Sequence, residues 1–203
     1  MKILGLAGSP RRNGNTDLLL AELLKGAASK GAEVKTLFLN NLKILPCQHC
    51  DACFKEGKCK FPDDMQNIYT ELEQADVIVL ASPVHFAGPT APVKAMIDRC
   101  QALWAKKYIL KIPPLSRERL RRGFLIMVGG TRMKDMFEPT RVIVKTWFHV
   151  LEIEPAGELT FSKVDEKGAI LKQPEAMQKA FEAGQKLAEP GVFRIEEPPP
   201  QTD

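Results

Sequence analysis

The sequence predicts a doubly wound α/β domain, in which helices cover both faces of a parallel β-sheet. Three apolar runs lead to this prediction, at residues 3–7, 77–81 and 124–128. They are continuous rather than alternating, which is typical of strands buried on both faces of a parallel sheet. The segments between them carry apolar residues at helical spacing, so strands and helices alternate along the chain. The chain has 203 residues and is most simply one domain, which we place at residues 1–188.

The first part of the chain supplies three of the strands. The run Ile3–Ala7 leads into a polar loop, and leucines at helical spacing after Thr16 predict a helix that ends near Lys30. A second strand is expected at residues 33–39, because its apolar residues are separated from that helix by a glycine suited to a C-cap. A helix that starts at Asp63 or Asp64 then reaches residue 74, and the third strand follows at 77–81.

The second part of the chain repeats the alternation. Thr90 is suited to cap a helix that packs apolar residues as far as Leu103, and the fourth strand is expected at 124–128. A helix at 139–151, a short fifth strand at 158–161 and a closing helix at 174–187 complete the prediction. Because crossovers between parallel strands are right-handed, we expect the flavodoxin-like strand order 2-1-3-4-5.

Three unusual loops follow strands at one edge of this sheet, at residues 8–16, 82–89 and 129–132. In such sheets ligands bind beyond the carboxyl ends of the strands, where the strand order reverses between strands one and three. We therefore expect the three loops to meet at one site.

The loop at residues 8–16 has the composition of an anion site. A helix N-terminus offers unpaired N–H groups and the positive end of a dipole. The loop adds hydrogen-bonding side chains and two cations, at Ser9, Asn13, Asn15, Thr16, Arg11 and Arg12. It matches neither the triphosphate-binding P-loop nor the usual dinucleotide fingerprint, which favours a mononucleotide phosphate. The simpler alternative is that Asn15 or Thr16 only caps the helix.

The loop at residues 82–89 combines prolines, small residues and the pair His85-Phe86. Its backbone groups suit the edge of a flat heteroaromatic ring, with His85 or Phe86 covering one face. The alternative is a rigid turn in which Phe86 is buried.

Four of the five cysteines stand in thirteen residues with the spacing C-x2-C-x2-C-x5-C, at Cys47, Cys50, Cys53 and Cys59. A structural zinc site usually uses two well-separated pairs, whereas three cysteines at this spacing resemble a run that wraps an iron–sulfur cubane. Cys59 is the expected fourth ligand, with Cys100 as the alternative, and Lys55, Lys58 and Lys60 would favour a reduced cluster. Zinc and a group of free thiols are the alternatives. We interpret His49 as a bystander and Cys100 as a core residue.

The chain resembles the NADPH-dependent FMN reductase-like branch of the flavodoxin-fold proteins, and within it the iron–sulfur flavoproteins. Three motifs carry the resemblance: the loop Gly8–Thr16, the stretch from Ser82 to Arg99, and the cysteine motif. The resemblance implies non-covalent FMN and a homodimer or homotetramer with the flavin near a subunit interface. It also implies a [4Fe–4S] cluster that exchanges electrons with the flavin.

The resemblance assigns roles to single residues. Ser9, Arg11, Asn15 and Thr16 would hold the phosphate of FMN, with Asn13 in the same loop. The isoalloxazine ring would be bordered by residues of two other loops, namely Pro83, Val84, His85, Phe86, Ala87, Gly129 and Gly130.

We therefore predict an oxidoreductase in which the cofactors do the chemistry, and we name no catalytic side chain. An NAD(P)H-dependent FMN or quinone-type reductase without a cluster is one alternative. A non-enzymatic electron carrier or flavin-binding sensor is another.

The basic residues from Lys106 to Arg122 are expected to form mainly a solvated face, which could also attract NADPH or an acidic ferredoxin. A net charge of +4 gives no argument for nucleic acid, and no apolar stretch suits a membrane span. We expect a cytoplasmic protein. Residues 46–62 form a cysteine-rich insertion, and residues 189–203 a tail that is disordered or contacts a partner.

Overall fold

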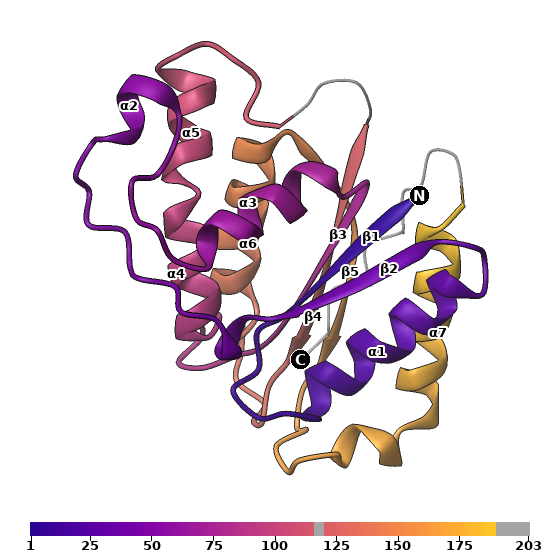
Figure 1. Cartoon of the computed structure of the whole chain (residues 1–203). Helices are drawn as coiled ribbons and strands as arrows, with labels where there is room; N and C mark the ends of the chain where they lie inside the picture. Colours follow the sequence, from indigo (N-terminus) through magenta and orange to yellow (C-terminus); the bar gives the residue numbers. More distant parts are fainter. Residues whose placement is uncertain (116–119, 190–203) are drawn as a thin grey trace.

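The computed structural model describes residues 1–115 and 120–189. Its centre is a sheet of five parallel strands in the order β2-β1-β3-β4-β5 (Figure 1). The strands are β1 (Lys2–Ala7), β2 (Glu33–Phe38), β3 (Val77–Pro83), β4 (Arg121–Val128) and β5 (Ile153–Phe161). The flavodoxin-like order expected from the sequence is confirmed.

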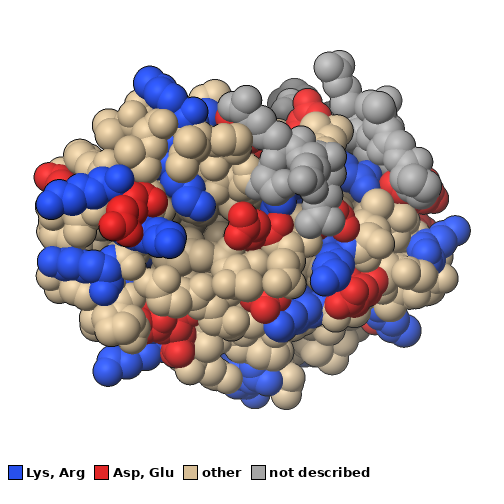
Figure 2. Space-filling model, turned by 45° about the horizontal axis from the view of Figure 1, so that its top comes forward, with Lys and Arg blue, Asp and Glu red and all other residues tan. Residues whose placement is uncertain are grey.

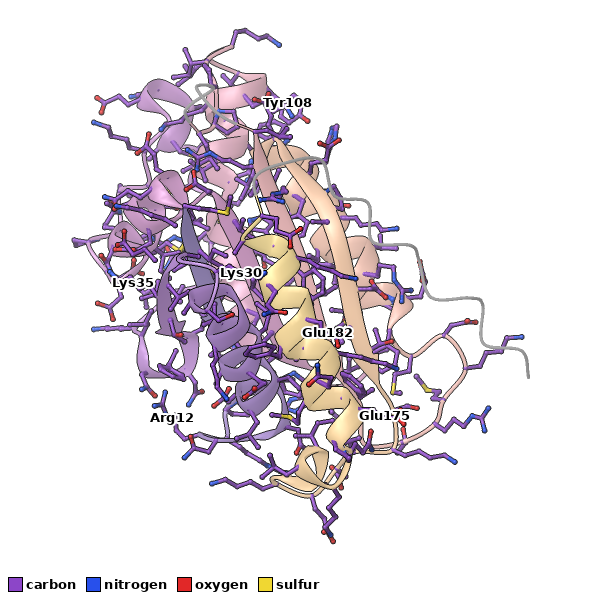
Figure 3. The ribbon with its side chains drawn as sticks, turned by 90° about the vertical axis from the view of Figure 1, so that its right-hand side faces the viewer. Arg12, Lys30, Lys35, Tyr108, Glu175 and Glu182 are labelled. Atoms are coloured by element: carbon purple, nitrogen blue, oxygen red, sulfur yellow. The ribbon has the colours of Figure 1, made fainter. Side chains whose placement is uncertain are left out.

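Helices cover both faces of the sheet (Figure 1). One face carries α1 (Asn15–Ala28) and α7 (Pro174–Leu187), which lie side by side in Figure 3. The other face carries α3 (Met65–Gln74), α4 (Ala91–Arg99), α5 (Gln101–Tyr108) and α6 (Glu138–Leu151). Figure 3 also places Arg12, near the start of α1, and Tyr108, at the end of α5, toward opposite ends of the molecule.

The buried strands divide their side chains between two cores. In β3, Ile78 and Leu80 face the core under α3, α4 and α6, whereas Val77 and Val79 face the core under α1 and α7. Strands β1 and β4 alternate in the same way. This explains the continuous apolar runs, since both faces of each strand are buried.

The helices α1 and α7 pack closely because a glycine lies between them. A Cβ atom on Gly184 would stand 1.8 Å from the carbonyl oxygen of Leu23. Any larger residue there would push the two helices apart.

Several element boundaries differ from those predicted. The edge strand β5 begins at Ile153 rather than near residue 158, and it tolerates Pro155 because only one of its sides is paired. The helix expected from Thr90 to Leu103 is two helices, α4 and α5, which break at Cys100. A short helix α2 (Cys53–Glu56) and two 3-10 turns, η1 (Leu39–Asn41) and η2 (Ala169–Lys172), were not predicted.

The expectation of a solvated basic face was wrong for two residues. Arg121 and Arg122 are buried at the start of β4. Arg121 donates hydrogen bonds to the carbonyl oxygens of Leu72, Glu73 and Ala75 at the end of α3, and Arg122 donates to that of Leu187. Both arginines therefore supply hydrogen-bond donors to the carbonyl oxygens at helix C-termini, where a positive charge is also favourable.

The surface charge is mixed. Figure 2 shows Lys and Arg side chains interspersed with Asp and Glu over the face it presents. Two further basic residues, Arg117 and Arg119, and residues 190–203 of the predicted tail lie outside the described residues. In the described part of the chain, none of the helices combines the length and the apolar character needed to cross a membrane.

Candidate functional site: a carboxyl edge and a cysteine pocket

The three unusual loops meet at the carboxyl ends of the strands, the lower edge in Figure 1, as predicted. The N–H of Gly8 donates to the carbonyl oxygen of Ala81 at 2.8 Å, and the hydroxyl of Thr90 donates to that of Gly8 at 2.6 Å. The N–H of Val84 donates to the carbonyl oxygen of Val128 at 2.8 Å. We call this region, formed by residues 8–16, 82–90, 129–132 and 164–170, the carboxyl edge.

The first loop leaves a helix N-terminus open. Helix α1 begins at Asn15 with Gly14 as its N-cap, and no side chain caps it. The interpretation of Asn15 or Thr16 as a simple cap was therefore wrong. The hydroxyl of Ser9 instead closes the loop on itself, because it accepts from the N–H of Arg11 at 3.1 Å and donates to the carbonyl oxygen of Arg11 at 3.0 Å. The N–H groups of the first turn of α1 are thus available to an anion.

Two of the predicted loop residues hold other parts of the protein. The side-chain amide of Asn15 donates to the carbonyl oxygen of Glu166 at 2.9 Å and accepts from the N–H of Ile170 at 3.2 Å. Arg11 reaches the carbonyl oxygen of Asp165 at 3.3 Å. Asn15 and Arg11 therefore attach the segment at residues 164–170 to the carboxyl edge. That segment was missed, since no sequence pattern pairs residue 15 with residues 150 positions away.

The buried carboxylate of Asp17 was also missed. Its Oδ2 accepts from the N–H of Asn13 at 3.0 Å, which holds Asn13 in the left-handed region at a φ of 55°. Its Oδ1 is buried, and no hydrogen-bond partner for it occurs among residues 1–115 and 120–189. Burial raises the pKa of Asp17, and the hydrogen bond from Asn13 and the charge of Arg12 oppose that rise. The acidic side chain thus lies directly beneath the anion loop.

The second loop ends in a strained turn. His85 and Gly88 exchange backbone hydrogen bonds at 2.9 and 3.0 Å, and the two residues between them, Phe86 and Ala87, have φ values of 51° and 63°. A left-handed phenylalanine is uncommon and is typical of functional loops. The alternative in which Phe86 is buried was wrong, because its relative exposure is 107%. The ring projects from the protein beside the predicted site.

The remaining predicted ring-border residues lie where the loops join. Pro83 and Val84 are half-buried at the end of β3. Gly129 is buried and donates its N–H to the carbonyl oxygen of Phe161 at 2.8 Å, whereas Gly130 is exposed. The hydroxyl of Thr140 donates to the carbonyl oxygen of Ala87 at 3.2 Å, which ties the turn to α6.

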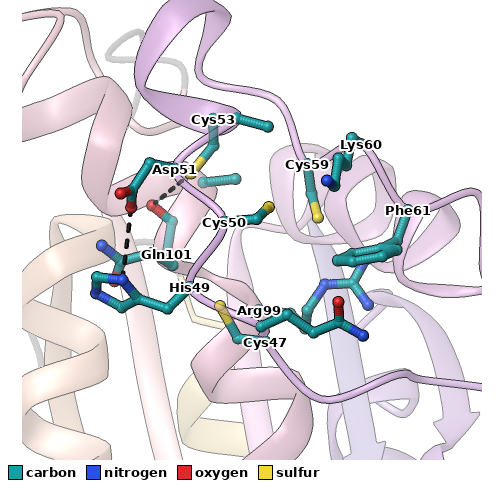
Figure 4. Close-up of a pocket in the computed structure, with 13 residues that line it drawn as sticks. Cys47, His49, Cys50, Asp51, Cys53, Cys59, Lys60, Phe61, Arg99 and Gln101 are labelled. Atoms are coloured by element: carbon teal, nitrogen blue, oxygen red, sulfur yellow. Dashed lines mark hydrogen bonds and ion pairs between the residues drawn. The ribbon is translucent and has the colours of Figure 1, made fainter.

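The four clustered cysteines line one cavity. This cavity lies at the end of α4, whereas the carboxyl edge lies at the start of that helix. Figure 4 shows Cys47, Cys50, Cys53 and Cys59 around the same space, with Phe61, Arg99 and Gln101 beside them. We call this site the cysteine pocket. Burial raises the pKa of Cys53, and the proximity of the other three thiols raises it further. The sequence motif therefore forms one site.

Two residues of the backbone that carries the cysteines have left-handed conformations. His49 and Asp51, which stand between the first three cysteines, have φ values of 48° and 55°. His49 itself is exposed, and its Nδ1 atom lies 3.6 Å from a carboxylate oxygen of Asp51.

A buried ion pair holds the base of the cysteine pocket. Arg99 donates from Nη1 to Oδ2 of Asp63 at 2.6 Å and from Nη2 to Oδ1 at 3.0 Å, and Nη1 also reaches the carbonyl oxygen of Leu45 at 2.9 Å. Burial alone would raise the pKa of Asp63, but hydrogen bonds from Arg99 and from the N–H of Leu45 outweigh burial and lower it. The pair joins the two ends of the cysteine segment to the last residue of α4.

Cys100 stands apart from the four other cysteines. It is buried in the core and accepts from the indole N–H of Trp147 at 3.3 Å. Burial raises the pKa of its thiol to about 12. The structure thus agrees with its interpretation as a core residue.

The carboxyl edge and its sheet match known proteins. A family described as NADPH-dependent FMN reductase matches residues 1–135. The chain belongs to this family. The match confirms the family that the sequence motifs resembled.

Two curated relatives carry the name iron–sulfur flavoprotein. One, from Archaeoglobus fulgidus, is 42% identical over 131 residues, which are 64% of this chain and 63% of the relative. The other, from Methanosarcina thermophila, is 34% identical over 150 residues, which are 74% of each chain. The first match thus spans less than two thirds of its relative's length.

Solved structures share the fold at low identity. An NAD(P)H:quinone oxidoreductase from Methanothermobacter marburgensis superposes with a TM-score of 0.71 at 16% identity and covers 95% of this chain and 97% of that one. A flavodoxin from the domain Archaea gives 0.55 at 14% identity, with 93% and 96% covered.

Proposed function

We propose that the protein is an FMN-dependent redox protein in which electrons pass between a [4Fe–4S] cluster in the cysteine pocket and FMN at the carboxyl edge. One observation carries the proposal: the four thiols of the cysteine motif line a single cavity in a chain whose strand-end loops meet at a flavin-type site. FMN supplies one- and two-electron chemistry when bound, and the cluster supplies one-electron chemistry.

The residues of the carboxyl edge fit FMN. The open N-terminus of α1 and the loop held by Ser9 would bind the phosphate, with Arg11, Asn13 and Thr16 beside it. Because the amide of Asn15 is committed to residues 164–170, Asn15 would contribute its backbone N–H. Backbone groups from Pro83 to Ala87 and at Gly129-Gly130 would bind the edge of the isoalloxazine ring. The exposed ring of Phe86 supports a role in covering the flavin or a neighbouring subunit.

The cysteine pocket fits a polynuclear group. A single zinc ion would draw four sulfurs to within about 2.3 Å of one centre. The four thiols line one cavity, and three of them stand at the x2 spacing of the runs that wrap a cubane, which takes one iron for each cysteine. Cys47, Cys50, Cys53 and Cys59 would be its ligands.

A second copy of the chain is the partner we propose. Exposed apolar side chains stand on the segments that form or adjoin the carboxyl edge, at Phe86, Met133 and Val142. Apolar groups exposed near one site favour an interface. Light scattering behind size exclusion should show a dimer or tetramer, and Phe86→Ser should shift it toward monomer. Ile109→Ser, which changes an exposed apolar residue at the end of α5 and away from the carboxyl edge, should not.

Two cysteine variants, compared with each other, test the cluster assignment. Cys53→Ser should abolish bound iron and acid-labile sulfide while FMN content stays near that of the unmodified protein. Cys100→Ser is the matched control, because it removes a thiol outside the pocket and should leave iron unchanged. Equal iron in the two variants would contradict the assignment. Rapid NADPH oxidation by an iron-free flavoprotein would favour the alternative, an NAD(P)H-dependent reductase without a cluster.

A further inference from the structure

Arg99 lies where the two candidate sites are joined. Helix α4 begins beside the carboxyl edge, where its N-cap Thr90 donates to Gly8, and ends with Arg99 in the wall of the cysteine pocket. Its nine residues span roughly 14 Å at 1.5 Å per residue. The end of α4 thus places the positive charge of Arg99 beside the cysteines.

The guanidinium of Arg99 is buried but only partly satisfied. Its side chain is 1% exposed, its Nη atoms donate to Asp63 and Leu45, and its Cζ atom lies 5.3 Å from the centroid of the Phe61 ring. Its Nε–H has no hydrogen-bond partner in the described part of the chain. Buried donors are nearly always paired, and Arg99 is one of the residues that line the cysteine pocket, so its open Nε–H indicates an acceptor bound there.

The cysteine pocket supplies such an acceptor when it holds an anionic sulfur group. Cys59 and Arg99 both line this cavity. Thiolates and bridging sulfides both accept N–H hydrogen bonds, and such bonds are among the factors that set cluster potentials. The open Nε–H is therefore explained by the group that the four cysteines would bind.

We propose that Arg99 is the positioning residue that sets the reduction potential of the group held by Cys47, Cys50, Cys53 and Cys59. This inference rests on the proposed function. The Nε–H donates to a sulfur of that group, and the buried positive charge favours its reduced form, which carries one more negative charge. Asp63 moderates the effect, because its carboxylate balances part of the charge of Arg99.

The buried cation outweighs the exposed ones. Lys55, Lys58 and Lys60, which the sequence suggested as the source of this effect, are all exposed. Solvent and salt screen exposed charges, whereas a buried charge is screened much less. Arg99 should therefore dominate the electrostatics of the pocket.

The test is a spectroelectrochemical titration of the anaerobically purified protein, with iron and sulfide measured for each variant. In Arg99→Gln/Asp63→Asn, the one-electron equilibrium of the cluster should shift at least tenfold toward the oxidised form, which is about 59 mV. Asp63→Asn alone should shift it the other way, because it leaves the charge of Arg99 unbalanced. Arg99→Lys, which keeps the charge and loses the Nε–H, should lie between the double variant and the unmodified protein. Lys58→Gln, which removes an exposed charge from the same loop, is the control. It should change the one-electron equilibrium of the cluster less than twofold.

The outcomes separate this inference from the function on which it rests. If the unmodified protein binds FMN without iron, the proposed cluster and this role for Arg99 both fail. If it binds four irons and the double variant keeps both its iron and its potential, only the role of Arg99 is overturned. Equal loss of iron in the double variant and in Asp63→Asn would show that the pair merely pins the loop, which also overturns it.

Discussion

The carboxyl edge and the cysteine pocket are built in different ways. The carboxyl edge consists of short loops tied by backbone hydrogen bonds, such as Gly8 to Ala81 and Val84 to Val128, and its helix N-terminus needs no particular side chain. The cysteine pocket consists of thiols on a long segment between β2 and α3, fixed at its base by one buried ion pair, Asp63 with Arg99.

This difference predicts different sensitivities to mutation. A site made mainly of backbone groups loses only part of its affinity when one side chain changes, whereas a side-chain site fails with the loss of one ligand or one anchor. The sheet therefore fixes the carboxyl edge, whereas the side chains of one segment and their anchor on α4, Arg99, fix the cysteine pocket.

The largest effect on stability should come from Asp63→Ala. It leaves the buried guanidinium of Arg99 without its carboxylate, and breaking a buried pair in this way costs about 3–5 kcal/mol. Chemical denaturation should show this loss, together with faster proteolysis of residues 46–62. Asp64→Ala is the matched control: Asp64 is exposed, its carboxylate accepts from the N–H of Lys43, and its loss should cost less than about 1 kcal/mol. Equal costs would mean that the ion pair does not anchor the pocket.

A smaller and separate effect is expected from Ser9→Ala. It removes both hydrogen bonds that close the anion loop, so FMN should bind roughly tenfold more weakly, or about 1.4 kcal/mol, with iron content unchanged. Flavin fluorescence titration measures this. The same substitution at Ser29, whose hydroxyl bonds Gly26 at the far end of α1, should leave FMN affinity unchanged. A joint loss of flavin and iron in Ser9→Ala would show that the two sites are not separable.

The smallest effect should come from Asp17→Asn, and its sign is the informative part. Removing a buried negative charge beneath the phosphate should tighten FMN binding by on the order of 1 kcal/mol, or about fivefold. The amide oxygen still accepts from the N–H of Asn13. Weaker FMN binding in the variant would show that the carboxylate helps to hold the loop more than it repels the phosphate.

The two buried aspartates should also give opposite pH dependences of stability. The pKa of Asp63 is lowered on folding, so its contribution is present above the unfolded value of about 3.9 and is lost as the pH falls through the folded value. The pKa of Asp17 is raised, so stability decreases as the pH rises from the unfolded value through the folded one. Denaturation should be measured across pH 3 to 7. The loss of stability at rising pH should disappear in Asp17→Asn, and the loss of stability at falling pH should disappear in Asp63→Asn. Unchanged slopes would contradict this assignment.

The sequence predicted most of the fold because the fold depends on local periodicity. The runs at 77–81 and 124–128 indicated strands buried on both faces, and the strand order followed from the handedness of crossovers. The closing helix was placed at its observed bounds, Pro174–Leu187. Strand β5 was predicted too short because an edge strand that contains Pro155 and two glutamates, Glu154 and Glu158, lacks a continuous apolar run.

The sites were predictable only where their residues are neighbours in the chain. Four cysteines within thirteen residues must lie close together, so the cysteine pocket could be predicted. The contacts that support it could not, because Asp63 and Arg99 are separated by 36 positions and each resembles a surface charge in the sequence. Arg121 was misjudged for the same reason, since a buried arginine at a helix end and a solvated one have the same local pattern.

Cofactor stoichiometry in the unmodified protein tests the central claim most directly. After anaerobic purification, iron, acid-labile sulfide and FMN should be measured on the same sample, together with the absorbance spectrum. The account predicts about four irons and four sulfides for each FMN and each chain. FMN at one per chain with no iron and no sulfide would contradict it.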